Sequence, residues 1–432
     1  MTRMRLIVSF LLCLGCTFVG VDAFGDNWPG WRGPTGQGVS RETDLPVTWS
    51  ATENVRWKAE LSDEGNSSPV VWGDQVLLTQ ASEKTHWPPE RDPKIPRGTS
   101  GGGAAVAEKR SLLCFDRTTG NLLWQSDTVY KVPEPTHRTN PFCSATPVTD
   151  GERIIVSHGS AGLLCYDMAG DLIWKHDIGK LDHVWGNASS PILYGDLVIL
   201  WCGPGSRQLL RAVNKRTGEK VWDHVEPQSE TGSDLQGTWA TPIVARVGEH
   251  DQLIMPFPYV MKGFNPKTGR ELWKQRGPGN FVYGSPLFAH GMAIFGKDAC
   301  KLEGQGVIEQ LRFERSGGGR GPHSPVVLGD YLYVGGSIPS CFEIKTGKEV
   351  WKEQIETRPG TSDAWASMVY ADDRLYFTDQ KGTTLVLAAG RRYEVLAKNV
   401  LKEHTNASIA VSQGNIFIRT WKHLWCIGNE SE

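Results

Sequence analysis

Aromatic, amide and histidine side chains recur just ahead of a repeated Ser-Pro or Thr-Pro landmark. If they converge on one opening, such rings and amides suit a planar or sugar-like ligand. Among them, His323 is the best candidate for proton transfer, because an imidazole titrates near neutral pH. The candidate ligand-binding residues are Asn187, Trp239, Tyr283, His323, Trp365 and Asn406, with Asn66 and Ser144 at the same position and His137, Trp185 and His404 slightly earlier.

Motifs of known catalytic sites are absent from the sequence. It has no CxxC pair, no His/Cys metal spacing, no nucleophile elbow and no phosphate loop. The glycine-rich run 317–321 neither follows a strand nor opens a helix, so we interpret it as a linker. We therefore predict no catalytic residue and no metal ligand. A structural alternative for the candidate residues is that the rings plug the opening and the amides satisfy backbone groups.

A short phrase ending in tryptophan organises most of the sequence. It reads Asp-Arg-Thr-Thr-Gly-Asn-Leu-Leu-Trp over residues 116–124. Asp or Asn opens a turn by bonding its own backbone, and Gly supplies a positive φ. The alternation of apolar and polar residues on either side is typical of two strands joined by a hairpin. We expect each tryptophan to cover the neighbouring sheet, and the copies end at Trp124, Trp174, Trp222, Trp273 and Trp351.

The landmark and the phrase together mark eight units, each with room for four short strands. This spacing predicts an all-β fold, an eight-bladed β-propeller of four-stranded antiparallel blades. In a propeller the first strand of each blade lines the central channel, so the candidate residues would ring one mouth. The fifth and seventh units lack the tryptophan, and we expect their outer strands at 309–314 and 393–397. The landmarks begin at Ser68, Thr146, Ser190, Thr241, Ser285, Ser324, Ser367 and Ser408.

The eighth unit ends near residue 426 without an outer strand of its own. The segment 54–61, around Trp57, matches the outer strands of the other units and precedes the first landmark. We predict that this segment closes the last blade, beside the sheet that holds Trp425, because closure protects sheet edges. Trp57 thereby joins the repeat tryptophans as a predicted blade-docking residue.

The ends and insertions of the chain have their own signatures. Residues 1–23 begin with Arg3 and Arg5, continue as an apolar run and end at Ala23, which is typical of a signal peptide. We expect an N-terminal extension at 24–54, the propeller at 55–428, and a long mobile loop at the Pro- and Gly-rich segment 83–110. No lipid anchor is expected, since the residues ahead of the early cysteines fit a lipid-attachment box poorly.

Composition restricts the partners. The chain has 432 residues, 39 % hydrophobic and 22 % charged, with a formal net charge of −2. This balance gives no reason to expect nucleic acid or an anionic membrane surface as a partner. No segment after the signal peptide is long and apolar enough to span a bilayer. We expect an exported, periplasmic or cell-envelope protein, and a monomer.

The cysteines form two groups. The first group occupies the same strand position in different repeats and is predicted to consist of small buried apolar residues: Cys114, Cys165, Cys341 and Cys426. The second group is irregular, and a disulfide within it is compatible with export: Cys143, Cys202 and Cys300.

The tryptophan phrase resembles the docking motif of the PQQ-type propeller repeat, which builds quinoprotein dehydrogenases and BamB-like proteins of outer-membrane assembly. The resemblance covers residues 55–427. The start, with Trp28-Pro-Gly-Trp-Arg-Gly-Pro and Trp49, is similar to exported PQQ-like repeat proteins of planctomycete-type bacteria. For that subgroup the resemblance implies an envelope location.

Two functions from different classes follow. The first is an exported scaffold, BamB-like by resemblance, that binds an envelope protein or polymer without catalysis and without a cofactor. The alternative is a quinone-dependent oxidoreductase that acts on an alcohol or sugar, with PQQ and Ca²⁺. Quinoprotein dehydrogenases use adjacent cysteines, and this chain has no Cys-Cys pair. A third option is a sensor that binds a small ligand without turnover.

Overall fold

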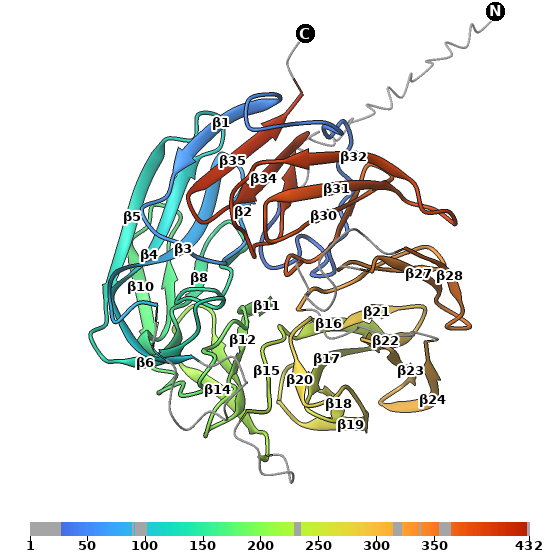
Figure 1. Cartoon of the computed structure of the whole chain (residues 1–432). Helices are drawn as coiled ribbons and strands as arrows, with labels where there is room; N and C mark the ends of the chain where they lie inside the picture. Colours follow the sequence, from blue (N-terminus) through green and yellow to red (C-terminus); the bar gives the residue numbers. More distant parts are fainter. Residues whose placement is uncertain are drawn as a thin grey trace, which may run out of the picture.

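Eight β-sheets are arranged radially around a central axis, so the protein is an eight-bladed β-propeller (Figure 1). The computed structural model describes residues 27–88, 90, 102–228, 235–313, 322–336, 338–353 and 364–429. Within these ranges each blade has four antiparallel strands, and the first blade also receives the short strand β6. The helical element of this part of the chain is the short 3-10 turn η1 (Gly159–Ala161). The predicted fold class is confirmed.

The first four blades are formed in chain order. Blade 1 has β2 (Val70–Trp72), β3 (Gln75–Thr85), β4 (Gly103–Asp116), β5 (Leu122–Val129) and β6 (Glu134–Thr136). Blade 2 has β7 (Val148–Thr149), β8 (Ile154–Ser157), β9 (Leu163–Tyr166) and β10 (Leu172–His176). Blade 3 has β11 (Ile192–Tyr194), β12 (Leu197–Cys202), β13 (Leu209–Asn214) and β14 (Lys220–Val225). Blade 4 has β16 (Ile243–Val247), β17 (His250–Phe257), β18 (Val260–Phe264) and β19 (Glu271–Arg276).

The last four blades follow the same pattern, except that the outer strand of blade 8 comes from the N-terminal side. Blade 5 has β21 (Leu287–Ala289), β22 (Met292–Phe295), β23 (Asp298–Glu303) and β24 (Gly306–Arg312). Blade 6 has β25 (Val326–Leu328), β26 (Tyr331–Val334), β27 (Ser340–Glu343) and β28 (Glu349–Lys352). Blade 7 has β29 (Val369–Ala371), β30 (Arg374–Thr378), β31 (Thr383–Ala388) and β32 (Val395–Val400). Blade 8 has β33 (Ala410–Ser412), β34 (Asn415–Arg419), β35 (His423–Gly428) and β1 (Val55–Glu60).

The Thr-Gly phrase forms the turn between the third and fourth strands of a blade. In blade 1 the Asp116 carboxylate accepts hydrogen bonds from the backbone N–H groups of Thr118 and Thr119, at 3.0 and 2.7 Å. Gly120 follows with a φ of +73°. A β-carbon at Gly120 would lie 2.5 Å from the Trp57 ring. This position therefore needs glycine both for its backbone conformation and for the close approach of the neighbouring indole.

Six repeat tryptophans each join their own blade to the next one around the ring. The indole Nε1 donates a hydrogen bond to a backbone carbonyl in the turn between the third and fourth strands of the following blade. The bonds run from Trp57 to Arg117 (2.8 Å), from Trp174 to Lys215 (2.9 Å), from Trp222 to Pro266 (3.1 Å) and from Trp351 to Gly390 (3.0 Å).

Two tryptophans vary this pattern. A β-carbon on Gly170 would lie 2.6 Å from the Trp124 ring, so Trp124 also packs on the next turn, although its Nε1 has no acceptor among the described residues. The Nε1 of Trp273 donates instead to Gln252 of its own blade, at 2.6 Å. The Trp273 ring still belongs to the same apolar cluster as Cys300 of blade 5. Blade 5 lacks the Thr-Gly phrase, which explains the different hydrogen bond.

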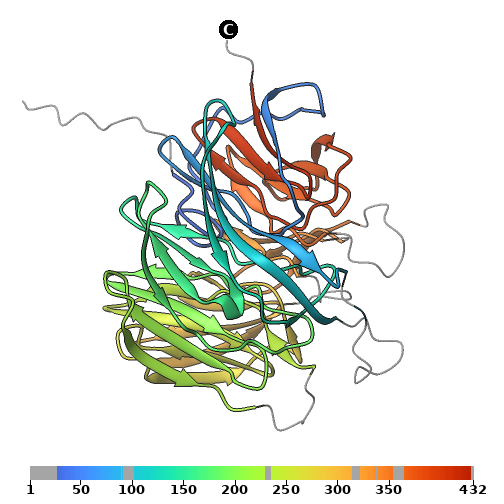
Figure 2. The ribbon, with the colours of Figure 1, turned by 90° about the vertical axis from the view of Figure 1, so that its left-hand side faces the viewer.

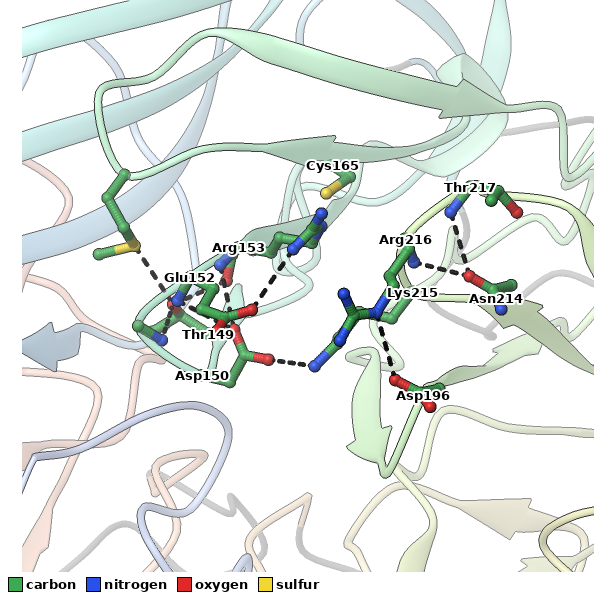
Figure 3. Close-up of polar contacts among 12 residues, drawn as sticks. Thr149, Asp150, Glu152, Arg153, Cys165, Asp196, Asn214, Lys215, Arg216 and Thr217 are labelled. Atoms are coloured by element: carbon green, nitrogen blue, oxygen red, sulfur yellow. Dashed lines mark hydrogen bonds and ion pairs between the residues drawn. The ribbon is translucent and has the colours of Figure 1, made fainter.

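Figure 3 shows the interface between blades 2 and 3. The Lys215 ammonium pairs with the Asp150 carboxylate in a hairpin turn of blade 2. Asn214 accepts hydrogen bonds from the backbone N–H groups of Arg216 and Thr217, at 2.8 and 3.1 Å. The Lys215 backbone carbonyl also accepts the Trp174 indole N–H. Lys215 therefore joins the two blades through both its side chain and its backbone.

The N-terminal strand closes the ring as the sequence predicts. Strand β1 pairs with β35 in antiparallel register, with Trp57 opposite Cys426 and Lys58 opposite Trp425 (Figure 1). The Lys58 ammonium lies 4.8 Å from the centroid of the Trp425 ring, in cation–π contact. The first and last described strands thus share one sheet.

A ring of hydroxyl groups joins the inner strands. In every blade the landmark Ser or Thr donates its backbone N–H to the side-chain oxygen of the landmark residue in the next blade. The ring closes from blade 8 to blade 1, so the landmark hydroxyls have a structural role that the sequence did not reveal. The bonds run from Ser68 to Thr146 (2.9 Å), Thr146 to Ser190 (2.9 Å), Ser190 to Thr241 (3.0 Å), Thr241 to Ser285 (3.2 Å), Ser285 to Ser324 (2.8 Å), Ser324 to Ser367 (2.9 Å), Ser367 to Ser408 (2.8 Å) and Ser408 to Ser68 (3.0 Å).

The N-terminal extension crosses one end of the channel. Trp28 exchanges backbone hydrogen bonds with Val71 of blade 1, at 2.8 and 2.9 Å. Residues 38 and 40 bond the backbone of Tyr370 in blade 7, at 2.8 and 2.9 Å. Val71 and Tyr370 both lie three residues after a landmark, whereas the candidate ligand residues lie before the landmarks. The extension therefore covers the end of the channel opposite to the candidate mouth.

Strand boundaries correct three predictions. The two ends of the predicted loop 83–110 are strand, because β3 extends to Thr85 and β4 begins at Gly103. This long hairpin, blue to cyan, runs diagonally across the face shown in Figure 2. The outer strands of blades 5 and 7 are β24 (Gly306–Arg312) and β32 (Val395–Val400), shifted from the expected 309–314 and 393–397. Residues 1–23 and the linker 317–321 lie outside the described residues.

All seven cysteines of the described chain are buried free thiols. The pairing considered for Cys143, Cys202 and Cys300 is therefore not formed. Burial raises the pKa of Cys202 and Cys300 to about 12, so both remain protonated at neutral pH. No helix in the described ranges is long and apolar enough to cross a membrane.

Candidate functional site

Five rings gather at the candidate mouth, on the side of blades 3, 4 and 5. Trp239 and Tyr283 stack with centroids 5.2 Å apart and planes at 28°. Phe281 lies 6.2 Å from Tyr283 and 5.4 Å from Trp185. His183 meets the Trp239 ring edge-on at 4.9 Å. The structure thus brings together Trp239, Tyr283 and Trp185, which the sequence singled out, and adds His183 and Phe281.

Backbone pairing between two inter-blade segments positions these rings. Strands β15 (Gly237–Thr238) and β20 (Phe281–Val282) form a short parallel pair. The pair continues as a 2.8 Å hydrogen bond from the Trp239 N–H to the Val282 carbonyl. The indole Nε1 of Trp239 donates to the Gly186 carbonyl at 2.9 Å. Trp239 is only 7 % exposed as a result, so its ring mainly packs against protein.

Amide side chains gather on the side of blades 8 and 1. Asn66 and Asn406 both donate to the carbonyl oxygen of Thr139, at 2.9 and 3.1 Å. Gln380 donates to the Asn406 amide oxygen at 2.7 Å, and the Trp421 indole donates to Asn66 at 3.4 Å. These amides bind a backbone group of the protein itself, as the structural alternative predicts.

The turn at residues 137–140 connects the amide cluster to the aromatic rings. Asn140 donates from its side chain to the carbonyls of Trp185 and Asn187, at 2.7 and 3.3 Å. The same turn carries the Thr139 carbonyl that Asn66 and Asn406 share. It therefore bridges three blades across the mouth.

His137 and His404 are neutral at pH 7, because their surroundings lower the pKa of both rings. Burial, together with the smaller effect of the positive charge of Arg138, lowers the pKa of His137 to about 4. His137 Nδ1 lies 2.7 Å from the Thr139 hydroxyl, and the Thr139 backbone N–H donates to it at 3.2 Å. Burial also lowers the pKa of His404, whose ring lies 4.0 Å from Trp421.

The remaining predicted residues have different surroundings. His323 is 8 % exposed, and a β-carbon on Gly336 would lie 2.6 Å from its ring. Trp365 is half buried, and in the described chain no ring contact joins it to the aromatic cluster. The Ser144 hydroxyl donates to the Pro141 carbonyl at 2.6 Å. No described group of three or more His, Cys, Asp or Glu could hold a metal ion.

Sequence reasoning missed several residues of the mouth, including Thr139, Gln380 and Trp421. Gln380 and Trp421 follow the second strands of their blades. In an antiparallel four-stranded sheet the second strand ends where the first begins, so its following turn reaches the same mouth. A search of those turns for polar and aromatic residues would have found both side chains.

The fold and the docked tryptophans define the class of this protein. It is an eight-bladed propeller whose blades are joined through Thr-Gly turns. Residues 108–282 and 263–431 match the family described as outer membrane protein assembly factor BamB, and the chain belongs to this family. The resemblance of the tryptophan phrase to the PQQ-type repeat is thus confirmed. The similarity of the N-terminal start to the planctomycete-type subgroup stays a prediction.

Individual relatives are distant. Tetrathionate hydrolase of Acidithiobacillus ferrooxidans is 23 % identical over 340 residues, which cover 76 % of this chain and 57 % of that protein. This chain therefore spans a little over half the length of that curated relative.

Solved structures with the same fold include a BamB protein and dehydrogenases. BamB from Moraxella catarrhalis has a TM-score of 0.56 at 12 % identity, covering 85 % of this chain and 98 % of its own. A europium-containing methanol dehydrogenase has a TM-score of 0.62 at 11 % identity, covering 89 % and 87 %. Quinohemoprotein alcohol dehydrogenase from Comamonas testosteroni has a TM-score of 0.60 at 12 % identity, covering 94 % and 81 %. These similarities establish the fold alone.

Proposed function

We propose that this protein is an exported β-propeller of the bacterial cell envelope that binds a protein or polymer and performs no catalysis. The observation that carries the proposal is an apolar rim on three consecutive blades. We define the rim by the exposed apolar side chains that lie one or two residues before the docking tryptophans of the outer strands β5, β10 and β14: Leu122, Leu123, Leu172, Ile173 and Val221. Membership of the BamB family supports a role in binding protein partners.

The rim is unusual because an exposed apolar side chain recurs at the same position of the outer strand in each of its three blades. Leu123, Ile173 and Val221 each directly precede a docking tryptophan and are 50 %, 44 % and 49 % exposed. Clustered apolar side chains on the surface of a soluble protein mark interaction sites more often than isolated ones do. Outer strands also carry unpaired backbone groups that can bind an added strand. A protein partner therefore fits this surface.

The chemistry of the mouth favours binding over quinone-dependent catalysis. PQQ held by calcium would need a free aromatic face and acidic ligands. The Trp239 ring is instead stacked on Tyr283, and its Nε1 is bonded to Gly186. The Asn66 and Asn406 amides are bonded to Thr139. The described mouth residues do not fit a quinone held by calcium.

The rim can be tested by charge substitution. Tagged protein would be mixed with envelope extract, and its bound material compared with that of Leu123→Lys/Leu172→Lys/Val221→Lys. We expect one specific partner with wild-type protein and its loss with the triple variant, because lysine does not bury in an apolar interface. Ile308→Lys is the matched control, since Ile308 is 55 % exposed on the outer strand of blade 5. Equal recovery by all three proteins, or no partner at all, contradicts the proposal.

Two catalytic alternatives are tested separately. Purified protein would receive PQQ and Ca²⁺ with a panel of alcohols and sugars, and dye reduction would be followed. Turnover that is lost in Trp239→Ala would establish the quinone-dependent alternative instead. Similarity to a tetrathionate hydrolase motivates a parallel assay with tetrathionate. Binding of a compound without turnover would indicate a sensor.

A further inference from the structure

A buried arginine without a carboxylate partner lies where the N-terminal extension crosses the channel. Arg32 is 2 % exposed. Its Nη2 donates to the carbonyls of Gln37 and Pro325, the latter at 2.6 Å. Nε and Nη1 are also buried, and neither has a hydrogen-bond acceptor among the described residues. More than half of the N–H donors of this guanidinium therefore lack a protein acceptor.

The Arg32 side chain keeps its positive charge at neutral pH. Burial lowers its pKa to about 9, and no acidic side chain of the described chain contributes to the shift. A buried cation without a counter-charge is strongly unfavourable. The site therefore requires a negative group that the described protein atoms do not supply.

Arg32 lies next to the hydroxyl ring of the inner strands. Pro325, whose carbonyl accepts from Arg32, directly follows the ring member Ser324. The preceding residue, Trp31, donates its indole N–H to the ring hydroxyl of Ser285 at 2.9 Å. The guanidinium is thus held at the start of the inner strand of blade 6, on the side of the channel that the extension crosses.

The ring adds further donors at the same level. Each landmark hydroxyl accepts a backbone N–H from the preceding blade, as in the pairs Ser324 to Ser367 and Ser408 to Ser68. A hydroxyl also has one hydrogen to donate. None of the eight ring hydroxyls donates to a protein acceptor in the part of the chain that the structure describes. Guanidinium and hydroxyl donors without matching acceptors are complementary to an anion.

We propose that a small monovalent inorganic anion, such as chloride, binds in the central channel against Arg32, between the N-terminal extension and the hydroxyl ring. The anion neutralises the buried guanidinium and accepts its Nε–H and Nη1–H hydrogen bonds. It thereby anchors the extension beside the inner strand of blade 6. This site lies on the opposite side of the hydroxyl ring from the candidate mouth, so it does not depend on the proposed partner binding.

Crystals of the wild-type protein grown in sodium bromide test the site directly. Anomalous scattering at the bromine edge should place a bromide in contact with the Arg32 guanidinium. Bromide only at other positions, or a channel that contains water alone beside Arg32, would overturn the proposal. This measurement needs no variant, so it stands even if substitution of Arg32 prevents folding.

Thermal unfolding supplies a second test in solution. Chloride would replace gluconate at constant ionic strength, and the unfolding midpoint of wild-type protein should rise, because a ligand that binds only the folded state stabilises it. Arg41→Met should respond like wild type, since Arg41 is exposed in the same extension. Arg32→Met should show no rise. An equal response of Arg32→Met and wild type would contradict the anion site.

Discussion

The backbone N–H of Ser408 donates a 3.0 Å hydrogen bond to the hydroxyl oxygen of Ser68, 340 residues away in the chain. This bond closes a ring in which every inner strand is tied to the next. Both residues are buried, with exposures of 4 % and 1 %. The inner ring and the outer tryptophans therefore fasten the same eight sheets at two radii.

Removal of one ring hydroxyl should destabilise the whole propeller. Ser68→Ala would leave the Ser408 N–H buried and without an acceptor, which typically costs about 1–3 kcal/mol. Denaturant unfolding should show this loss at pH 7. Thr43→Ala removes an exposed hydroxyl of the extension and should change the free energy of unfolding by less than about 0.5 kcal/mol. Equal stability of Ser68→Ala and Thr43→Ala would show that the ring bond is dispensable.

Trp57 should contribute through both its ring and its N–H group. Its side chain is 8 % exposed and donates to Arg117 at 2.8 Å. We expect Trp57→Ala to cost about 3–5 kcal/mol, because it leaves a cavity at the closing sheet. Trp57→Phe keeps an aromatic ring but loses the hydrogen bond, so it should cost less. Calorimetry of both variants checks this order.

Removal of residues 24–61 would eliminate β1 and expose the edge of β35. We expect an aggregating or protease-sensitive product, because an unpaired sheet edge recruits other chains. A soluble, fully folded deletion protein would contradict closure by the N-terminal strand.

His137 should make the mouth sensitive to acid. Its pKa falls from 6.5 to about 4 on folding, mainly through burial. The unfolded chain therefore binds more protons between these values, so this histidine reduces stability as the pH falls from about 6.5 towards 4. Above that window it adds no pH dependence. NMR titration should show the His137 ring unprotonated at pH 5.5, and a titration midpoint near 6.5 would disprove its burial.

The amides that bind Thr139 should protect the mouth turn from proteolysis. Arg138 is exposed in this turn and is a trypsin site. Asn66→Ala/Asn406→Ala removes both side-chain donors to the Thr139 carbonyl, so cleavage after Arg138 should become several-fold faster, since cleavage follows local opening. Asn121→Ala, at an exposed turn of blade 1, is the control. Mass spectrometry of the fragments identifies the cut.

Local patterns were sufficient to predict most of the fold. Alternating strands, the Thr-Gly turn and the docking tryptophans all belong to hairpins whose residues lie close in sequence. Even the pairing of Trp57 with the last blade was predictable, because the missing outer strand left one open position and one matching segment. The boundaries of the loop 83–110 were drawn too wide, because Gly103, at the start of β4, and its neighbours are weak strand formers, yet pairing with β3 and β6 keeps them extended.

The sequence by itself determined the repeat, the eight blades, the closing strand and the proximity of Trp239 to Tyr283, because each follows from position within the repeat. Only the tertiary structure decided that Asn66 and Asn406 bind Thr139, that the landmark hydroxyls form a closed ring, and that the extension places Arg32 in the channel. The contacts of Asn66, Asn406 and Arg32 join segments more than 70 residues apart, and the bond that closes the ring joins residues 340 apart. No periodic pattern encodes the contacts of Thr139 and Arg32, since they depend on which segments meet once the ring has closed.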